Sequence, residues 1–261
     1  MKAVILAGGY GTRISEESQY KPKPMIEIGG KPILWHIMKE YSAFGIYEFI
    51  ICAGYKQQMI KEWFSNYFLY TSDVTFDFTD GQNIIFHEQH SEPWKVTVVD
   101  TKEGTMTGGR IKRIQPYVGN ETFCMTYGDG VCDVNITELI KFHKSHGKIA
   151  TLTAVFRKET KGILHIGGDN AVHVFREKSK IDSAPINAGY MVLEPKIFDY
   201  LLGGDQCIFE QEPLRRLSEE GELMSYQHRG FWQCMDTLRE KIELEKLWNT
   251  GDAPWKVWTE K

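Results

Sequence analysis

The fold is decided by a stretch near the N-terminus that reads Ala3-Val4-Ile5-Leu6-Ala7-Gly8-Gly9-Tyr10-Gly11-Thr12-Arg13. Residues 3–7 are apolar, too few for a helix and followed at once by glycine, which is typical of a short buried strand. The glycines allow backbone N–H groups to converge on an anion, and Arg13 adds a planar cation that suits phosphate oxygens. The stretch therefore predicts a strand that runs into a phosphate-binding loop.

The segments after this loop alternate between helical and strand patterns. Residues 31–44 carry apolar side chains at helical spacing, residues 49–53 form a second apolar run that Gly54 ends, and residues 57–68 again favour a helix. This β-α-β-α order predicts an α/β fold, a Rossmann-like, mixed but mostly parallel sheet flanked by helices. In such sheets ligands bind beyond the carboxyl ends of the strands.

The rest of the chain gives shorter patterns. The pieces VTFDF and VTVVD within residues 74–101 predict strands around the site rather than a further βα unit. Further strands are expected at 123–127, 149–156, 163–166, 171–175 and 188–193, and helices from 108 and at 135–146, 194–202, 211–221 and 236–248. No linker or internal repeat interrupts these patterns, so we expect one domain over residues 1–261 with a small C-terminal lobe.

The spacing of the glycine loop separates it from two other nucleotide loops. A Walker A loop needs G-x-x-x-x-G-K-[ST], and a dinucleotide loop needs G-x-G-x-x-G with an acidic residue about 20 positions later. This chain has G-G-x-G-T-R at 8–13, followed by Lys21-Pro22-Lys23-Pro24, whose prolines hold two ammonium groups near the loop. An NAD-dependent enzyme is therefore disfavoured, whereas Gly8-Gly9 alone would indicate only a turn.

Two aspartates are candidate metal ligands. Asp129 lies between two glycines after the apolar run 123–127, and Asp236 precedes a helical pattern. Phosphoryl transfer depends on charge neutralisation, and Mg²⁺ binds one or two carboxylates together with phosphate oxygens. Each residue also has a structural interpretation, since aspartate favours turns and Asp236 suits the N-cap of a helix that begins near Thr237.

Composition limits the class of protein. Hydrophobic residues make up 42% and charged residues 25% of the chain, as in ordinary globular proteins, and the net charge of −4 argues against a dedicated nucleic-acid binder. Five cysteines without a C-x-x-C pair suggest neither a disulfide framework nor a zinc ribbon, and reduced thiols in the cytoplasm are the simplest interpretation. No apolar run approaches the roughly 18 residues needed to span a bilayer, so we expect no membrane association.

The motifs taken together resemble a known family. LAGGYGTR at 6–13 and KPKPMIEIGGKPILWHIM at 21–38 resemble the signature of the sugar-phosphate nucleotidyltransferases. The resemblance continues in YGDGV at 127–131, EKSK at 177–180, INAGYMVLEP at 186–195 and GFWQCMDTLREK at 230–241. The series is most similar to members that transfer a cytidylyl group from CTP to α-D-glucose 1-phosphate.

This resemblance implies a fold of the nucleotide-diphospho-sugar transferase type, Mg²⁺ as cofactor, in-line attack on the α-phosphate, and a homo-oligomer, a hexamer or another assembly. It implies a nucleotide-binding core at 1–155 and a part at 156–261 that binds the sugar phosphate and closes or oligomerises. By the same resemblance, the catalytic residues are Arg13, Lys23 and Asp129, and the metal ligands are Asp129 and Asp236.

The resemblance also implies two sets of binding residues. The nucleotide set comprises Leu6, Ala7, Gly8, Gly9, Gly11, Thr12, Arg13, Lys23, Ala53, Gly54, Thr107, Gly108, Gly109 and Arg110. The sugar-phosphate set comprises Tyr127, Gly128, Gly162, Glu177, Lys178, Asn187, Gly189 and Trp232. Four of these residues also have a structural interpretation. Arg110 could lie in a surface helix turn instead of binding phosphate, Trp232 could be a core residue, and Glu177-Lys178 could be a solvated charge pair.

The chain departs from the family pattern at residues 157–162, Ser179 and Ala188, all on the acceptor side. The alternatives are therefore another nucleotide (dTTP or UTP), another sugar 1-phosphate, or a catalytically silent nucleotide-binding regulator. A catalytically silent regulator would have lost Arg13, Lys23, Asp129 or Asp236, and all four are present here.

We interpret His143 and His146 as solvated helix residues, and expect the aromatic tail at 253–258 to dock on the core.

Overall fold

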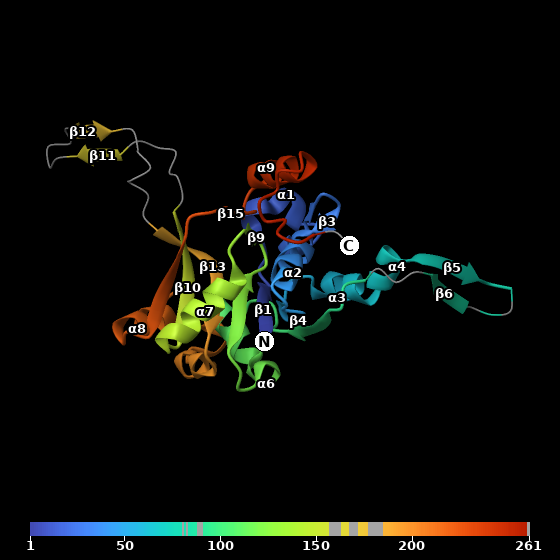
Figure 1. The fold of residues 1–261 in the computed structure, drawn as a ribbon, viewed down its shortest axis with the longest axis horizontal. Coiled ribbons are helices and arrows are strands. Elements are labelled where there is room, and N and C mark those ends of the chain that lie inside the picture. The colour runs from blue at the N-terminus through green and yellow to red at the C-terminus, as the bar shows by residue number, and fades with distance from the viewer. Residues whose placement is uncertain are drawn as a thin grey trace.

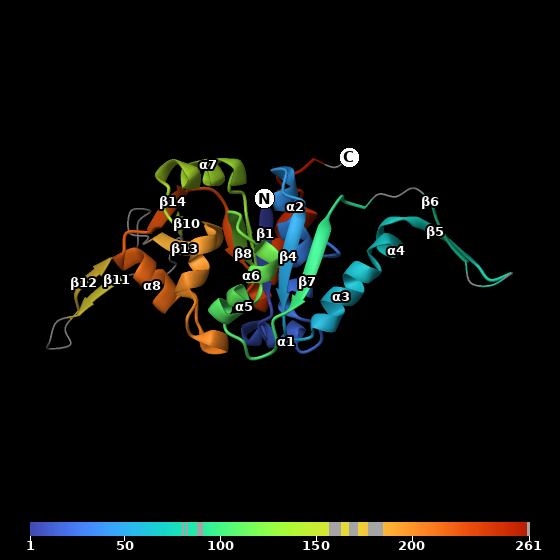
Figure 2. The same ribbon diagram turned by 90° about the horizontal axis from the view of Figure 1, so that it is seen from below.

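The computed structural model describes residues 1–79, 81, 83–87, 91–156, 163–166, 172–176 and 185–259. Its centre is a seven-stranded sheet in the order β14-β10-β13-β8-β1-β4-β7 (Figures 1 and 2). The strands are β1 Lys2–Ala7, β4 Glu48–Ala53, β7 Lys95–Asp100, β8 Phe123–Tyr127, β10 Ala150–Phe156, β13 Pro185–Leu193 and β14 Leu223–His228. Of these, β13 alone runs antiparallel to its neighbours, so the predicted mixed, mostly parallel sheet is confirmed.

Helices and short two-stranded ribbons complete the described chain. The α-helices are α1 Ser15–Ser18, α2 Ile33–Ala43, α3 Gln57–Ser65, α4 Tyr67–Thr71, α5 Thr107–Arg113, α6 Gln115–Val118, α7 Ile136–His146, α8 Glu212–Glu219 and α9 Leu238–Asn249. The ribbons are β2 Glu27–Ile28 with β3 Lys31–Pro32, β5 Asp73–Asp77 with β6 Asn83–His87, β9 Gly130–Cys132 with β15 Trp232–Cys234, and β11 Ile163–Ile166 with β12 Val172–Arg176. Short 3-10 turns lie at Thr12–Ile14, Lys23–Met25, Pro195–Tyr200 and Gly204–Gln206.

The first strand is buried on both faces, as its unbroken apolar run predicts. Successive side chains of a strand point to opposite faces, so Ile5 packs with Ile37 of α2 while Val4 packs with Ile111 of α5. Helices therefore cover both faces, and the loop that follows β1 emerges at the carboxyl edge of the sheet.

The prediction for residues 74–101 is wrong in two respects. The segment VTVVD is part of β7, which pairs in parallel with β4 and so extends the sheet by a further βα unit. The segment VTFDF lies in the β5–β6 ribbon, which projects away from the body of the molecule rather than surrounding the site (Figures 1 and 2). Strand β7 lies at the edge of the sheet and is mostly half-buried, with Val96 and Val98 packed against one core cluster and Val99 in the other. Strand β14 was not anticipated at all.

His143 and His146 of α7 are packed against neighbouring residues, so their interpretation as solvated helix residues is wrong. His143 is almost completely buried, with Nδ1 at 2.8 Å from Thr151 Oγ1 and Nε2 at 3.1 Å from Glu194. His146 is also hydrogen-bonded to Thr151 Oγ1 at 2.8 Å. Both side chains join α7 to β10, and neither belongs to a cluster of possible metal ligands among the described residues.

The aromatic tail docks on the core, as expected. Trp255 is fully buried and stacks on Phe231 with ring centroids 5.6 Å apart. Its indole N–H donates to Nδ1 of the buried His36 at 3.3 Å, and His36 Nε2 lies 2.8 Å from the Ile28 carbonyl. The two bonds need one accepting and one donating ring nitrogen, so the imidazole is neutral.

Within the described residues, no helix is both long and apolar enough to cross a membrane.

This arrangement predicts a pH effect on stability. Burial lowers the pKa of His36 to about 4, so between pH 6.5 and pH 4 the unfolded chain binds a proton that the folded protein excludes. Stability is therefore lost as the pH falls through this window, by about 2 kcal/mol between pH 7 and pH 5. Urea unfolding at both pH values should show this loss in the native chain but not in His36→Gln, whose amide can donate and accept without titrating. Equal losses in both proteins would contradict the assignment.

Candidate active site

A cavity of about 570 Å³ opens where β1 and β8 end. This volume lies within the range typical of small-molecule sites. The cavity brings together most of the predicted site residues: Leu6, Ala7, Gly8, Gly9, Gly11, Thr12, Arg13, Lys23, Thr107, Arg110, Tyr127, Gly128 and Asp129. The carboxyl edge of a parallel sheet thus holds the site, as the β-α-β-α order predicts.

The glycines of the loop are required by close contacts. A side chain at Gly8 would place its Cβ 2.1 Å from the Arg110 guanidinium, and Gly11 has a left-handed φ of +67° that other residues rarely adopt. Gly9 is exposed and has no neighbour within 4 Å of a Cβ position, so its backbone is open to a ligand. The loop is therefore fixed at two glycines and accessible at the third.

The charged groups of the cavity form one network. Lys23 Nζ donates to Asp129 Oδ2 and to Asp236 Oδ1, each at 2.5 Å, and Arg13 donates to Asp236 Oδ2 at 2.5 Å. Burial alone would lower the pKa of Lys23, but the two carboxylates outweigh it and raise this pKa. Burial likewise opposes ionisation of Asp236, yet the hydrogen bond and charge of Lys23 hold its pKa below the usual value. Both groups are therefore ionised.

The two aspartates meet because of the β9–β15 ribbon. Asp129 directly precedes β9, Asp236 follows β15, and the Met235 N–H donates to the Asp129 carbonyl at 2.8 Å. One carboxylate oxygen of each lies 2.5 Å from the same ammonium, so these oxygens are close enough to share one divalent cation. Two carboxylate oxygens are donors that suit a magnesium-type ion. In this structure Lys23 bridges the two carboxylates.

The predicted N-cap role of Asp236 is wrong. Helix α9 begins after Thr237, whose Oγ1 accepts from the Glu240 N–H at 3.3 Å while the Glu240 carboxylate accepts from the Thr237 N–H at 2.9 Å. This capping box satisfies the helix end without the Asp236 side chain. Asp236 is therefore left to pair with Lys23 and Arg13.

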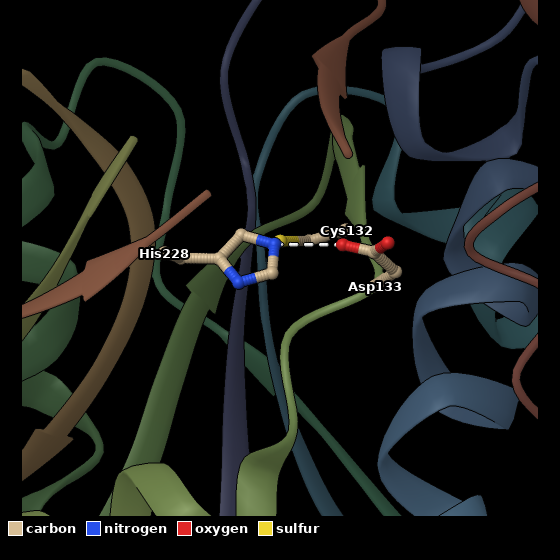
Figure 3. Close-up of side chains that lie close together, drawn as sticks. All are labelled: Cys132, Asp133 and His228. Atoms are coloured by element: carbon tan, nitrogen blue, oxygen red, sulfur yellow. Dashed lines mark hydrogen bonds and ion pairs between the residues drawn. The ribbon is translucent and has the colours of Figure 1, made fainter. Parts of the chain in front are cut away.

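A second cluster beside the ribbon is structural. The side chains of Cys132, Asp133 and His228 bring possible metal-ligand atoms within 4.8 Å of one another (Figure 3). Asp133 Oδ1, however, already accepts from His228 Nε2 and from the Phe231 N–H, both at 2.7 Å. Burial also raises the pKa of the Cys132 thiol well above its usual range, which disfavours the thiolate that binds metals. The cluster ties the turn between β14 and β15 to the end of β9.

Arg110 does not lie in the surface turn that one of its two interpretations predicted. It is only 5% exposed, so it is not part of a surface turn. Its guanidinium donates to the Gly8 carbonyl at 2.9 Å, to Thr101 Oγ1 at 2.7 Å and to the Lys102 carbonyl at 2.9 Å. Arg110 thus fixes the glycine loop against the ends of β4 and β7, and contact with phosphate stays a prediction.

The remaining residues predicted near the base fall into two groups. Thr107 lines the cavity, but Gly108 and Gly109 face inward, where a Cβ would lie 2.4 Å from Cys207 Sγ and 2.8 Å from the Gly204 carbonyl. A Cβ at Gly54 would lie 2.5 Å from Arg110, and Ala53, with its carbonyl bonded to Thr101, is likewise behind the loop. These glycines permit close packing, and a direct role in base binding stays a prediction.

Of the sugar-phosphate residues that the structure describes, Tyr127 and Gly128 line the cavity, whereas Asn187 and Gly189 on β13 and Trp232 on β15 lie outside its lining. Asn187 Oδ1 accepts from the Gly189 N–H at 2.8 Å, and a Cβ at Gly189 would lie 2.3 Å from the Tyr127 ring. Trp232 is half-buried and donates through Nε1 to the Ala188 carbonyl at 2.8 Å. Gly162, Glu177, Lys178 and Ser179 lie outside the described residues.

Glu210 is a residue that sequence reasoning missed. Its carboxylate accepts from the Tyr127 hydroxyl and, at 2.6 Å, from Thr107 Oγ1. It therefore joins the predicted sugar side of the cavity to the nucleotide side. The carboxylates of EQEPL at 210–214 give no periodic signal, and only the fold brings Glu210 to the cavity rim.

The comparisons with known proteins agree with this geometry. Residues 2–237 match the family model described as nucleotidyl transferase. The chain is 57% identical over 259 residues to glucose-1-phosphate cytidylyltransferase of Salmonella typhimurium, covering 99% of this chain and 100% of the relative. It is 45% identical to the probable glucose-1-phosphate cytidylyltransferase of Bacillus subtilis, with the same coverage.

Solved structures share the fold. HddC from Yersinia pseudotuberculosis complexed with GMP-PN gives a TM-score of 0.69 at 24% identity and covers 95% of this chain and 99% of that one. UDP-glucose pyrophosphorylase complexed with UDP-glucose gives 0.68 at 17% identity, with 96% and 98% covered. With its sheet, its glycine loop, its paired carboxylates and a family match over most of its length, the chain belongs to the nucleotidyl transferase family.

Proposed function

We propose that this protein transfers the cytidylyl group of CTP to α-D-glucose 1-phosphate, giving CDP-glucose and pyrophosphate. The observation that carries the proposal is the 57% identity, over almost the whole of both chains, to a glucose-1-phosphate cytidylyltransferase. The ionised network of Arg13, Lys23, Asp129 and Asp236 supports it, because a silent nucleotide-binding protein has no need of such a set.

The proposed reaction is one in-line displacement. An oxygen of the sugar 1-phosphate forms a bond to the α-phosphorus of CTP, and the bond from that phosphorus to the pyrophosphate oxygen breaks. The attacking oxygen is already anionic, so no residue has to remove a proton. Positioning and charge stabilisation then supply the acceleration.

Each charged residue has a part in this reaction. Asp129 and Asp236 would hold a divalent cation, Mg²⁺ in our proposal, which neutralises charge on the triphosphate oxygens. Arg13 and Lys23 lie beside these carboxylates and would bind phosphate oxygens, and the open backbone of Gly9 offers an N–H group. Tyr127, Asn187 and Trp232 would border the sugar.

A substrate panel tests the proposal. CTP, UTP, dTTP, ATP and GTP are each combined with glucose 1-phosphate and with other sugar 1-phosphates, and pyrophosphate release is measured. We expect kcat/KM for CTP with glucose 1-phosphate to exceed that of every other pair by at least about 100-fold, because a wrong base or sugar leaves polar groups of the site unpaired. Preference for dTTP, UTP or another sugar would support the alternative specificity, and no release with any pair would support the silent regulator.

We also propose that the protein is a homo-oligomer, with the β5–β6 ribbon as a contact. The ribbon projects from the body (Figure 1), and it exposes Phe76 at 52%, Phe78 at 72% and Ile84 at 52%. Exposed apolar patches of this kind mark interaction surfaces. Sedimentation should show an assembly for the native chain and a smaller species for the double variant Phe76→Ser and Phe78→Ser. A monomeric native chain would contradict the proposal.

The state of the thiols supports a cytoplasmic location, which we propose on this ground alone. All five cysteines are unpaired, and Cys52, Cys124, Cys132 and Cys207 are buried. Free thiols persist where glutathione and thioredoxin keep them reduced.

A further inference from the structure

A buried carboxyl group lies behind the ribbon that carries the two aspartates. Glu40, on α2, is only 1% exposed, and no described lysine or arginine forms an ion pair with it. The Cys132 N–H donates to Glu40 Oε1 at 3.3 Å, and Glu40 Oε2 is hydrogen-bonded to the hydroxyl of the fully buried Tyr190. The same hydroxyl lies 3.0 Å from the Gly130 carbonyl oxygen.

Counting hydrogens shows which form of Glu40 fits. The Tyr190 hydroxyl has one proton but lies within bonding distance of two oxygens, Glu40 Oε2 and Gly130 O. An ionised Glu40 would leave one of these buried oxygens without a donor, which is costly. A protonated Glu40 donates to Tyr190, which then donates to Gly130, so that every group is paired. Burial raises the pKa of Glu40 well above its usual value, in agreement with the neutral form.

This chain of hydrogen bonds ends on the strand that follows Asp129. Gly130 and Cys132 are the first and last residues of β9, so Glu40 and Tyr190 together hold both ends of the strand. Strand β9 pairs with β15, which ends two residues before Asp236. The placement of both carboxylates therefore depends on how firmly β9 is held against α2 and β13.

We propose that Glu40 and Tyr190 are positioning residues, a neutral hydrogen-bonded pair that fixes β9 and thereby sets the affinity of Asp129 and Asp236 for a divalent cation. The inference rests on the proposed function in one respect, that these two aspartates hold the metal. It assigns no contact between Glu40 and any substrate.

Two substitutions of Glu40 separate this role from a charge effect. Glu40→Gln keeps both bonds, because the amide oxygen accepts from Cys132 and the amide nitrogen donates to Tyr190. Glu40→Leu has a similar volume but removes both. We expect the affinity for Mn²⁺, used as a probe and titrated without nucleotide by electron paramagnetic resonance, to be nearly unchanged in Glu40→Gln. We expect it to fall by about 10-fold or more in Glu40→Leu, the loss typical of outer-shell metal partners.

Two tyrosine variants complete the test. Tyr190→Phe removes the donor to Gly130 and should weaken Mn²⁺ binding in the same direction, and it keeps the inference testable if Glu40→Leu does not fold. Tyr41→Phe is the matched control, because Tyr41 stacks on Tyr190 with ring centroids 5.9 Å apart and is equally buried, yet its hydroxyl forms no hydrogen bond with Glu40 or Gly130. In turnover assays, saturating metal should restore most of kcat in Tyr190→Phe while the KM for CTP stays normal.

The outcomes distinguish this inference from the proposed function. Unchanged Mn²⁺ affinity in Tyr190→Phe, or equal losses in Glu40→Gln and Glu40→Leu, would overturn the inference even if CTP is the substrate. Conversely, the expected order of Mn²⁺ affinities would support it even if the substrate panel selected another nucleotide.

Discussion

Asp129→Asn and Asp236→Asn are each expected to lower kcat by about 10²–10³-fold, the loss seen when one preorganised charge-stabilising group is removed. Each change replaces a carboxylate with an amide of nearly the same shape, and it removes one negative charge from the pair that faces Lys23. The amide is a poor ligand for a hard divalent cation, so the charge that develops on the triphosphate is no longer neutralised. Steady-state kinetics over a range of Mg²⁺ concentrations measures the effect.

The matched control for these variants is Asp133→Asn. Asp133 directly follows β9, but its Oδ1 accepts from His228 (Figure 3) and from the Phe231 N–H rather than from Lys23. An asparagine oxygen can still accept both bonds, so kcat and its dependence on Mg²⁺ should stay near those of the native chain. Near-normal turnover in Asp129→Asn or Asp236→Asn would show that the metal assignment of that residue is wrong.

Lys23→Ala should lower kcat by about 10²–10³-fold with a smaller change in the KM for CTP. Lys23 is 7% exposed and bridges both aspartates. If the two carboxylates held a divalent cation, the ammonium would be available to the phosphates, and its interaction would strengthen as charge moves onto the leaving pyrophosphate. Such an interaction acts mainly in the transition state, so its loss appears in kcat.

Lys21→Ala provides the comparison for Lys23. Lys21 pairs with Glu27 at 2.9 Å, outside the cavity, and its loss should leave kcat nearly unchanged. Lys23→Ala should also melt at a lower temperature without metal, because Asp129 and Asp236 then repel each other, and Mg²⁺ should restore more of its stability than in the native chain. A normal kcat in Lys23→Ala would remove its proposed role, and a larger loss in Lys21→Ala would mean that the family motif was aligned incorrectly.

Several errors of sequence reasoning have a common cause. The pattern VTVVD at 96–100 suggests a strand around the site, whereas it belongs to the edge strand of the central sheet, whose pairing with β4 no local pattern shows. The position of Asp236 before a helix suggested a cap, although Thr237 and Glu240 satisfy that helix end. His143 was interpreted as solvated, and a surface turn was one of two interpretations of Arg110, because polar side chains usually lie at the surface, whereas both residues are buried with hydrogen-bonded partners.

Elements with a local cause can be predicted from the residues alone. Five apolar residues followed by glycine specify β1 and its loop, and apolar spacing specifies α2, because burial of one run or one stripe needs no knowledge of the rest of the chain. Which distant groups meet depends on the folded arrangement of the chain. Asp129 and Asp236 are brought to one ammonium by the β9–β15 ribbon, and Glu40 becomes neutral because α2 buries it against Tyr190. Charge state and ligand geometry depend on distances between segments far apart in the chain, and no local pattern records those distances.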